Sequence, residues 1–209
     1  MNELQQAMAS NGLIAILRGL VPSEACAVGQ ALYEEGFRLI EVPLNSPEPF
    51  DSIRLLRQSL PADCIVGAGT VLSPGQVEQV KAAGGQLIVM PHSDPRVLDA
   101  AKAAGLYLAP GVGTATEAFS ALAHGADVLK LFPAEAMPPA VIKALLAVLP
   151  KGTALVPVGG ITAGNLAAYA AAGAKGFGLG SGLFTPGLSA DDVRQRARAY
   201  VNAWRALGQ

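Results

Sequence analysis

Signals that end a helix recur along this chain at intervals of 20 to 25 residues. Each follows an alanine-rich helical pattern and precedes a β-rich run: Gly36, Leu60-Pro61, Gly84, Gly105, Gly125, Leu149-Pro150 and Gly173. Glycine tolerates the left-handed conformation that ends many helices, and proline removes a backbone donor and clashes with the preceding turn. The spacing therefore predicts a repeat of one strand and one helix.

With a first strand at Leu13–Leu17, this repeat gives eight strands, each followed by a helix. Helix starts are expected at Pro22, Ser73, Asp94, Thr114 and Thr162. The fold class is α/β, and eight such units close most simply into a (β/α)8 TIM barrel, here with an extra N-terminal helix over the first residues. We expect a single domain over residues 1–209. A doubly wound open sheet is the alternative.

The charge of the chain argues against polyanionic partners. Charged residues make up 15% of the 209 residues, and the formal net charge is −1. Such a balanced chain has no field that would hold nucleic acid or an anionic membrane. No apolar run approaches the roughly 20 residues that a membrane helix needs.

The termini and the cysteines favour the cytoplasm. The start of the chain, Met1–Gln6, does not resemble a secretory signal. Cys26 and Cys64 lie in apolar surroundings, so we expect buried thiols in a reducing compartment. We expect neither a metal nor a nucleotide cofactor, because metal-ligand spacing and a dinucleotide or Walker fingerprint are absent from the sequence.

Lys130 carries the sharpest chemical signal. It interrupts the apolar run Val128–Pro133, and the alternation of a strand predicts that it points into the barrel with Val128 and Phe132. Burial lowers the pKa of a lysine and makes the neutral amine available as a nucleophile. A structural ion pair with a carboxylate is the alternative interpretation.

Glu41 and Arg18 stand near the ends of the second and first strands. An inward Glu41 could move protons or form an ion pair. Arg18 could bind a carboxylate or phosphate, or form a salt bridge with Glu41.

Two short glycine turns follow the last two strands, at Gly159-Gly160 and Gly180-Ser181. In barrels these loops commonly hold a phosphate through backbone N–H groups, although ordinary turn chemistry would also explain the glycines. Thr70 offers a hydroxyl at the same end of the barrel. We expect a surface or loop position for His92.

Several ordered motifs together resemble the 2-keto-3-deoxy-6-phosphogluconate/galactonate aldolase family, over nearly the whole chain. They are Ile16–Gly19, Ile40–Val42, Gly67–Leu72, Pro110-Gly111 with Thr114, Leu129–Glu135 and Gly159–Ile161. The resemblance implies a class I aldolase on a trimeric (β/α)8 barrel, with Lys130 as the Schiff-base lysine and Glu41 as the proton shuttle. It also implies that six residues bind the carboxylate and phosphate of the substrate: Arg18, Thr70, Gly159, Gly160, Gly180 and Ser181.

Two departures resemble the phosphogalactonate branch of that family. The phosphogluconate branch has a threonine and an arginine in the segment where this chain has Pro43–Pro47, and a Pro-Thr-Gly-Gly turn where it has Pro157–Gly160. Phe132–Glu135 keeps the phosphogluconate-like form. We therefore expect cleavage of 2-dehydro-3-deoxy-6-phosphogalactonate to pyruvate and glyceraldehyde 3-phosphate, with the gluconate epimer or both epimers as the alternative.

Two other classes of function stay open at this point. A sugar-phosphate epimerase or isomerase could use the same phosphate loops and Glu41 without a lysine adduct. A non-catalytic sugar-phosphate binding protein would bind its ligand without turnover.

Overall fold

The computed structural model describes residues 2–208, and this part of the chain alternates strands with helices as the repeat predicts. The strands are β1 (Leu13–Ile16), β2 (Leu39–Pro43), β3 (Ile65–Gly69), β4 (Leu87–Val89), β5 (Tyr107–Ala109), β6 (Gly111–Val112), β7 (Leu129–Leu131), β8 (Leu155–Pro157) and β9 (Phe177–Leu179). The α-helices are α1 (Glu3–Ser10), α2 (Pro22–Glu34), α3 (Pro49–Ser59), α4 (Pro74–Ala82), α5 (Pro95–Ala103), α6 (Ala115–Ala123), α7 (Pro139–Leu146), α8 (Leu166–Ala171) and α9 (Ala190–Arg205). A short 3-10 helix, η1 (Ala134–Ala136), follows β7.

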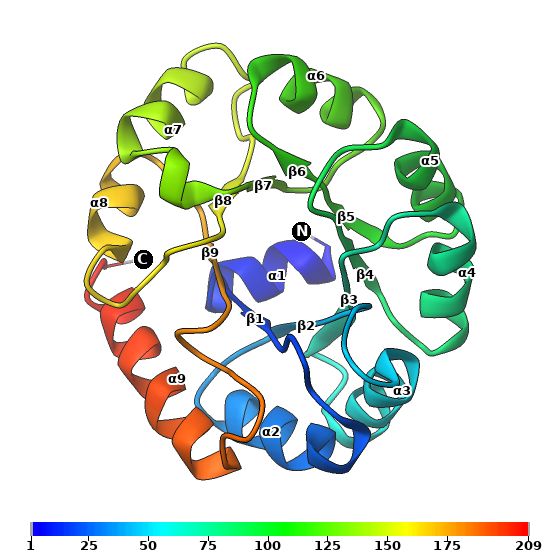
Figure 1. The fold of residues 1–209 in the computed structure, drawn as a ribbon. Coiled ribbons are helices and arrows are strands. Elements are labelled where there is room, and N and C mark those ends of the chain that lie inside the picture. Colours follow the sequence, from blue (N-terminus) through cyan, green and yellow to red (C-terminus); the bar gives the residue numbers. More distant parts are fainter. Residues whose placement is uncertain (1, 209) are drawn as a thin grey trace.

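The strands form curled parallel sheets, and helices α2 to α9 surround them (Figure 1). One sheet has six strands in the order β5-β4-β3-β2-β1-β9, and the other has three in the order β6-β7-β8. A single parallel bridge between Val158 and Gly178 links the β8 end to β9. The fold is therefore α/β with parallel strands, and the open-sheet alternative does not describe it because the strands curl round a common interior.

The fifth predicted strand is divided, which corrects the expected count of eight. Pro110 separates β5 from β6, and the chain passes there from the larger sheet to the smaller one. Proline has no N–H to donate to a ladder, although its carbonyl still accepts a bond from Lys130 N at 2.9 Å.

The helix-ending signals lie where the sequence predicts them. Backbone φ is positive at all five glycines: Gly36, Gly84, Gly105, Gly125 and Gly173. Four of the five expected helix starts are also confirmed, with Ser73, Asp94 and Thr114 as side-chain caps. The start expected at Thr162 is wrong. There α8 begins at Leu166, because Asn165 bonds the loop instead: its Oδ1 accepts from Thr162 N and its Nδ2 donates to Gly160 O.

Alternate residues of the strands build two apolar layers. Leu129 and Leu131 pack into the larger cluster between strands and helices, whereas Val128 belongs to an interior cluster. The interior cluster also contains Ile14, Ile16, Leu39, Ile65, Leu87, Val89, Ala109, Val156 and Val158. The alternation predicted for the Lys130 strand is therefore correct.

The predicted N-terminal helix is α1, which crosses the centre of the view in Figure 1. Its buried residues Leu4 and Ala7 join the interior cluster, so the helix covers one end of that interior. Among residues 2–208, the helices are too short or too polar to cross a bilayer.

The expectation of two buried thiols is half correct. Both cysteines are free, and Cys64 is buried, but Cys26 is exposed. The reason is its position on α2, where Ala25 and Val28 face the core and Cys26 faces outward.

Candidate active site

A cavity of about 650 Å³ lies at the carboxyl ends of the strands. Its lining includes seven of the eight residues predicted for the site: Arg18, Thr70, Lys130, Gly159, Gly160, Gly180 and Ser181. They come from loops and strands far apart in the sequence: Arg18 and Ser181 are separated by 163 positions. Carboxyl ends of parallel strands meet at one end of the fold, which explains their convergence.

Lys130 lies at the base of this cavity on β7, and only 7% of it is exposed. Burial lowers the pKa of the Lys130 ammonium, with nearby Arg18 adding to the effect and Glu41 opposing it. Nζ lies 5.0 Å from the ring centroid of Phe132, within range of a cation–π interaction. A buried lysine with a lowered pKa is the form in which an amine can act as a nucleophile.

Glu41 lies one layer below the cavity, on β2. It does not line the cavity, but it shares with Lys130 a small void of about 10 Å³, close to the lower limit for one water molecule. Glu41 is 1% exposed, and within residues 2–208 its Oε2 has no hydrogen-bond partner. Burial raises the pKa of the carboxyl to about 7, against the opposing charges of Lys130 and Arg18. A group with this pKa can take up and release a proton near neutrality.

Lys130 and Glu41 do not form an ion pair: among the ion pairs of residues 2–208, none joins Lys130 Nζ to a Glu41 carboxylate oxygen within 4.0 Å. The alternative of a closed structural pair therefore does not describe them. Their charges still influence each other through space, since each shifts the pKa of the other. The separation leaves both groups available to a molecule between them.

Arg18 does not form the salt bridge with Glu41 that the sequence allows. Its side chain is exposed in the cavity, and Nη1 donates to Asn45 Oδ1 at 2.6 Å. The next backbone N–H, that of Gly19, donates to the buried hydroxyl of Ser46 at 2.9 Å. The loop after β2 thus fixes both the end of β1 and the direction of the Arg18 guanidinium.

Thr70 follows β3 with a φ of +56°. Left-handed backbone is unusual for a β-branched residue and costs free energy, which the surrounding structure has to offset. Such strain is often found where a side chain or N–H must face a ligand, and Thr70 lines the cavity.

The two glycine turns present unpaired backbone donors. In residues 2–208, the N–H groups of Gly160, Ser181 and Gly182 donate to no backbone carbonyl or side chain of the protein. The N–H of Gly159 instead faces β9 in the parallel bridge between Val158 and Gly178. Successive free N–H groups of this kind bind anions. The backbone at Gly159 and Gly160 has φ of +107° and +64°, a conformation that glycine adopts without strain.

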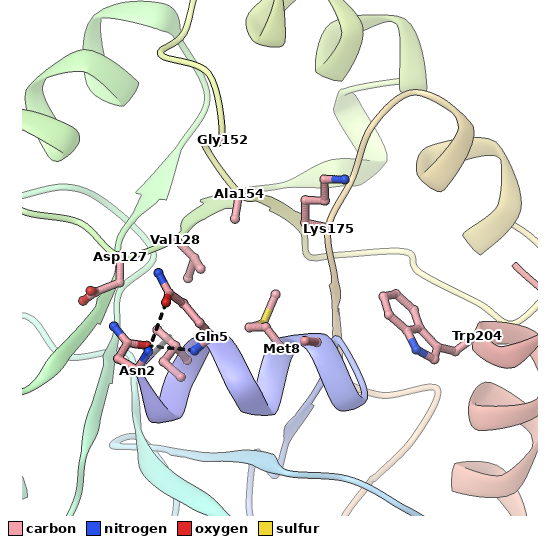
Figure 2. A pocket seen from close by; sticks show the side chains of 11 residues that line it. Asn2, Gln5, Met8, Asp127, Val128, Gly152, Ala154, Lys175 and Trp204 are labelled. Carbon is pink, nitrogen blue, oxygen red and sulfur yellow. Dashed lines mark hydrogen bonds between the residues drawn. The ribbon is translucent and has the colours of Figure 1, made fainter. Parts of the chain in front are cut away.

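A second cavity, of about 380 Å³, lies at the opposite, amino ends of the strands (Figure 2). There α1 directs Gln5 and Met8 into the space beside Val128, and Trp204 of α9 closes one side. It contains none of the predicted site residues. The carboxyl-end cavity is therefore the better candidate for chemistry.

The family model described as "KDPG and KHG aldolase" matches residues 4–198. The chain belongs to this aldolase family. A "Probable 2-dehydro-3-deoxy-6-phosphogalactonate aldolase" from Rhizobium meliloti (strain 1021) is 51% identical over 93% of this chain and 92% of its own. The "2-dehydro-3-deoxy-6-phosphogalactonate aldolase" of Escherichia coli (strain K12) is 47% identical over 94% and 96%. A solved structure described as "Native KDPGal structure" superposes with a TM-score of 0.92, at 46% identity over 94% of this chain and 96% of that one.

Membership of the aldolase family confirms the resemblance drawn from the sequence motifs. His92 lies in the loop after β4, as expected, and is not in the lining of the cavity. Within residues 2–208, no cluster of three or more His, Cys, Asp or Glu side chains could hold a metal ion.

The aldolase cavity is also lined by residues that were not predicted for the site, among them Asn45, Glu135 and Val158. Asn45 and Val158 lie in the two segments that distinguish the branches of the family, so sequence comparison could have identified them. Glu135 is in the motif Leu129–Glu135, but the sequence gives no sign that its side chain turns back toward Gly159.

Proposed function

We propose that this member of the family is a class I aldolase that cleaves 2-dehydro-3-deoxy-6-phosphogalactonate to pyruvate and glyceraldehyde 3-phosphate. The observation that carries the proposal is the pair formed by Lys130 and Glu41, both buried at the carboxyl ends of the strands and joined by no ion pair. The names of two relatives, which are 51% and 47% identical to this chain, support the choice of substrate.

Lys130 supplies the nucleophile. Its neutral amine attacks the C2 ketone, and loss of water gives an iminium on Nζ. When the C3–C4 bond breaks, the iminium accepts the electron pair and becomes an enamine. The positive charge of the iminium nitrogen therefore makes it the electron acceptor when the C3–C4 bond breaks.

Glu41 moves the proton. Its carboxylate, directly or through one water molecule, takes the proton of the C4 hydroxyl as C4 becomes the aldehyde of glyceraldehyde 3-phosphate. The same proton then returns to C3 of the enamine, and hydrolysis of the resulting iminium releases pyruvate and the free lysine. The pKa of about 7 suits a group that has to accept and donate a proton in one cycle.

The remaining cavity residues bind the charged ends of the substrate. The free N–H groups of Gly160 and Ser181, with Gly159 and Gly180 beside them, are suited to the phosphate. Arg18 and Thr70 bind the carboxylate end, with Arg18 directed by Asn45. Val158, whose side chain lines the cavity, contacts the substrate near C4.

Four further features of the protein concern its domain, its barrel, its assembly and its compartment. We propose one domain over residues 1–209, because a single apolar cluster contains residues from Leu13 to Trp204. A closed (β/α)8 barrel is supported by the Val158–Gly178 bridge and by the bonds from Asp127 N and Val128 N to Leu108 O. A homotrimer is supported by the exposed apolar side chains Leu72 and Phe119. The free thiols Cys26 and Cys64 support the cytoplasm.

Borohydride reduction in the presence of pyruvate tests the mechanism. The expected result is one added three-carbon unit, which mass spectrometry of peptides places on Lys130. The variant Lys130→Arg keeps the charge but should form no adduct and show no turnover. If Lys130→Arg is trapped as well as the wild type, or if the adduct lies on another lysine, the assignment is wrong. An epimerase or a binding protein would give no adduct at all.

A further inference from the structure

Glu135 turns back over the glycine turn that follows β8. It lies in η1, after β7, and its exposed side chain lines the aldolase cavity. A Cβ placed on Gly159 would be 2.2 Å from Glu135 Oε2, and one placed on Gly160 would be 2.5 Å from Glu135 Cγ. The side chain of Glu135 therefore fills the space directly above these two glycines.

The carboxylate of Glu135 has no partner that would explain its place there. In the described part of the chain, it accepts no hydrogen bond and forms no ion pair. The neighbouring N–H group of Gly160 likewise donates to nothing within residues 2–208. A negative charge thus lies beside an unused anion-binding donor without bonding to it.

We propose that Glu135 competes with phosphate for the phosphate subsite and so limits its preference for phosphorylated ligands, and that its carboxylate must rotate away before the phosphate group of a substrate can bind. The proposal rests on the proposed function, which assigns Gly159 and Gly160 to the phosphate. The two anions cannot share this space, because they would clash and repel each other. An exposed glutamate has three rotatable bonds and can swing toward solvent.

This arrangement weakens the binding of phosphate. A ligand whose phosphate enters the subsite has to displace Glu135, whereas an unphosphorylated aldehyde leaves the carboxylate in place. A phosphate dianion carries enough charge and enough acceptor oxygens to offset this displacement through the free N–H groups. The charge of Glu135 therefore lowers the preference of the subsite for phosphorylated aldehydes.

The test compares Glu135→Gln with the wild type in the aldol direction, with pyruvate and either glyceraldehyde 3-phosphate or unphosphorylated glyceraldehyde. The amide keeps the size of the side chain and removes its charge. The ratio of kcat/KM for the phosphorylated aldehyde to kcat/KM for the other should rise about two- to fivefold, the size of one exposed charge–charge interaction. The inhibition constant for inorganic phosphate should fall by a similar factor.

Two further variants make the result specific. Glu78→Gln changes the net charge equally on the exposed face of α4 and should leave the ratio unchanged. Glu135→Asp keeps the charge but withdraws it by one methylene, and should give a ratio between wild type and Glu135→Gln. Thermal unfolding checks that each variant is folded.

A ratio that is unchanged or lower in Glu135→Gln overturns the proposal, and a lower ratio would mean that Glu135 binds the substrate instead. Failure of the proposed function looks different. In that case the wild type itself forms no pyruvate adduct and no aldol product. If it forms the adduct but is not inhibited by phosphate, the phosphate subsite has been assigned wrongly, and the role of Glu135 fails with it.

Discussion

The carboxylate of Glu41 lies against Gly69 of the neighbouring strand, so closely that a Cβ on Gly69 would be 1.7 Å from Oε2. The two residues belong to β2 and β3, which pair in parallel from Leu39 to Pro43. Backbone φ at Gly69 is not in the left-handed region, so glycine is needed here for space and not for conformation. The absence of a side chain at position 69 sets where the proposed proton shuttle can lie.

Gly69→Ala should therefore damage both stability and activity. The new methyl group has to displace the buried Glu41, at a cost of about 1–3 kcal/mol in the free energy of unfolding. Because Glu41 moves, kcat should fall as well. Urea unfolding and steady-state kinetics measure the two effects. Gly75→Ala is the matched control, because nothing lies within 4 Å of a Cβ there. Equal effects of the two substitutions would contradict the argument.

Glu41 should control the acid limb of the pH–rate profile. Burial raises the pKa of Glu41 from 4.5 to about 7, so the carboxylate becomes available as a base only as the pH rises through that value. We expect kcat/KM for cleavage to increase with pH up to about 7. Glu41→Gln should form the borohydride-trapped adduct but exchange the methyl protons of pyruvate far more slowly. Unchanged exchange would remove Glu41 from the proton path.

The same shift has a consequence for stability. The folded protein holds the Glu41 proton more tightly than the unfolded chain, so the favourable contribution is full below pH 4.5 and is lost as the pH rises toward 7. The loss is up to about 3 kcal/mol, from 1.36 kcal/mol for each pKa unit. The side chain of Glu41→Gln does not titrate, so the variant lacks this pH-dependent contribution to stability. The difference in unfolding free energy between variant and wild type should therefore change between pH 5 and pH 7.5, and a constant difference would be the contrary result.

Asn45 should act through Arg18. Asn45→Ala removes the acceptor that directs the guanidinium, which is otherwise exposed and free to adopt other rotamers. The KM of the substrate should rise about threefold to tenfold, as for a lost hydrogen bond to a charged group, with a smaller effect on kcat. Asn202→Ala, on the exposed side of α9, provides the control. A variant that loses kcat but keeps its KM would show that Asn45 has another role.

The periodic features of the fold could be predicted because they depend on local chemistry. Gly36 and Gly84 end helices through backbone conformation, and the inward position of Lys130 follows from strand alternation. The division at Pro110 depends on which sheet the chain joins on each side, which is a property of the tertiary structure. Glu135 was missed for a similar reason: its contact with Gly159 links residues of two different loops, and no pattern within either loop encodes it.

Val158 should influence the choice between the C4 epimers. Its side chain is 7% exposed and lines the cavity immediately before the Gly159-Gly160 turn, whereas the phosphogluconate branch of the family has a threonine there. Val158→Thr nearly preserves the shape and adds one hydroxyl. If this hydroxyl bonds the C4 oxygen of the gluconate epimer, it contributes about 1 kcal/mol, or roughly fivefold, to kcat/KM for that epimer. The galactonate epimer should lose activity, because the buried hydroxyl then lacks a partner. The ratio of kcat/KM for the two epimers measures the change directly. A variant in which both values fall equally would show that Val158 serves packing and does not distinguish the configuration at C4.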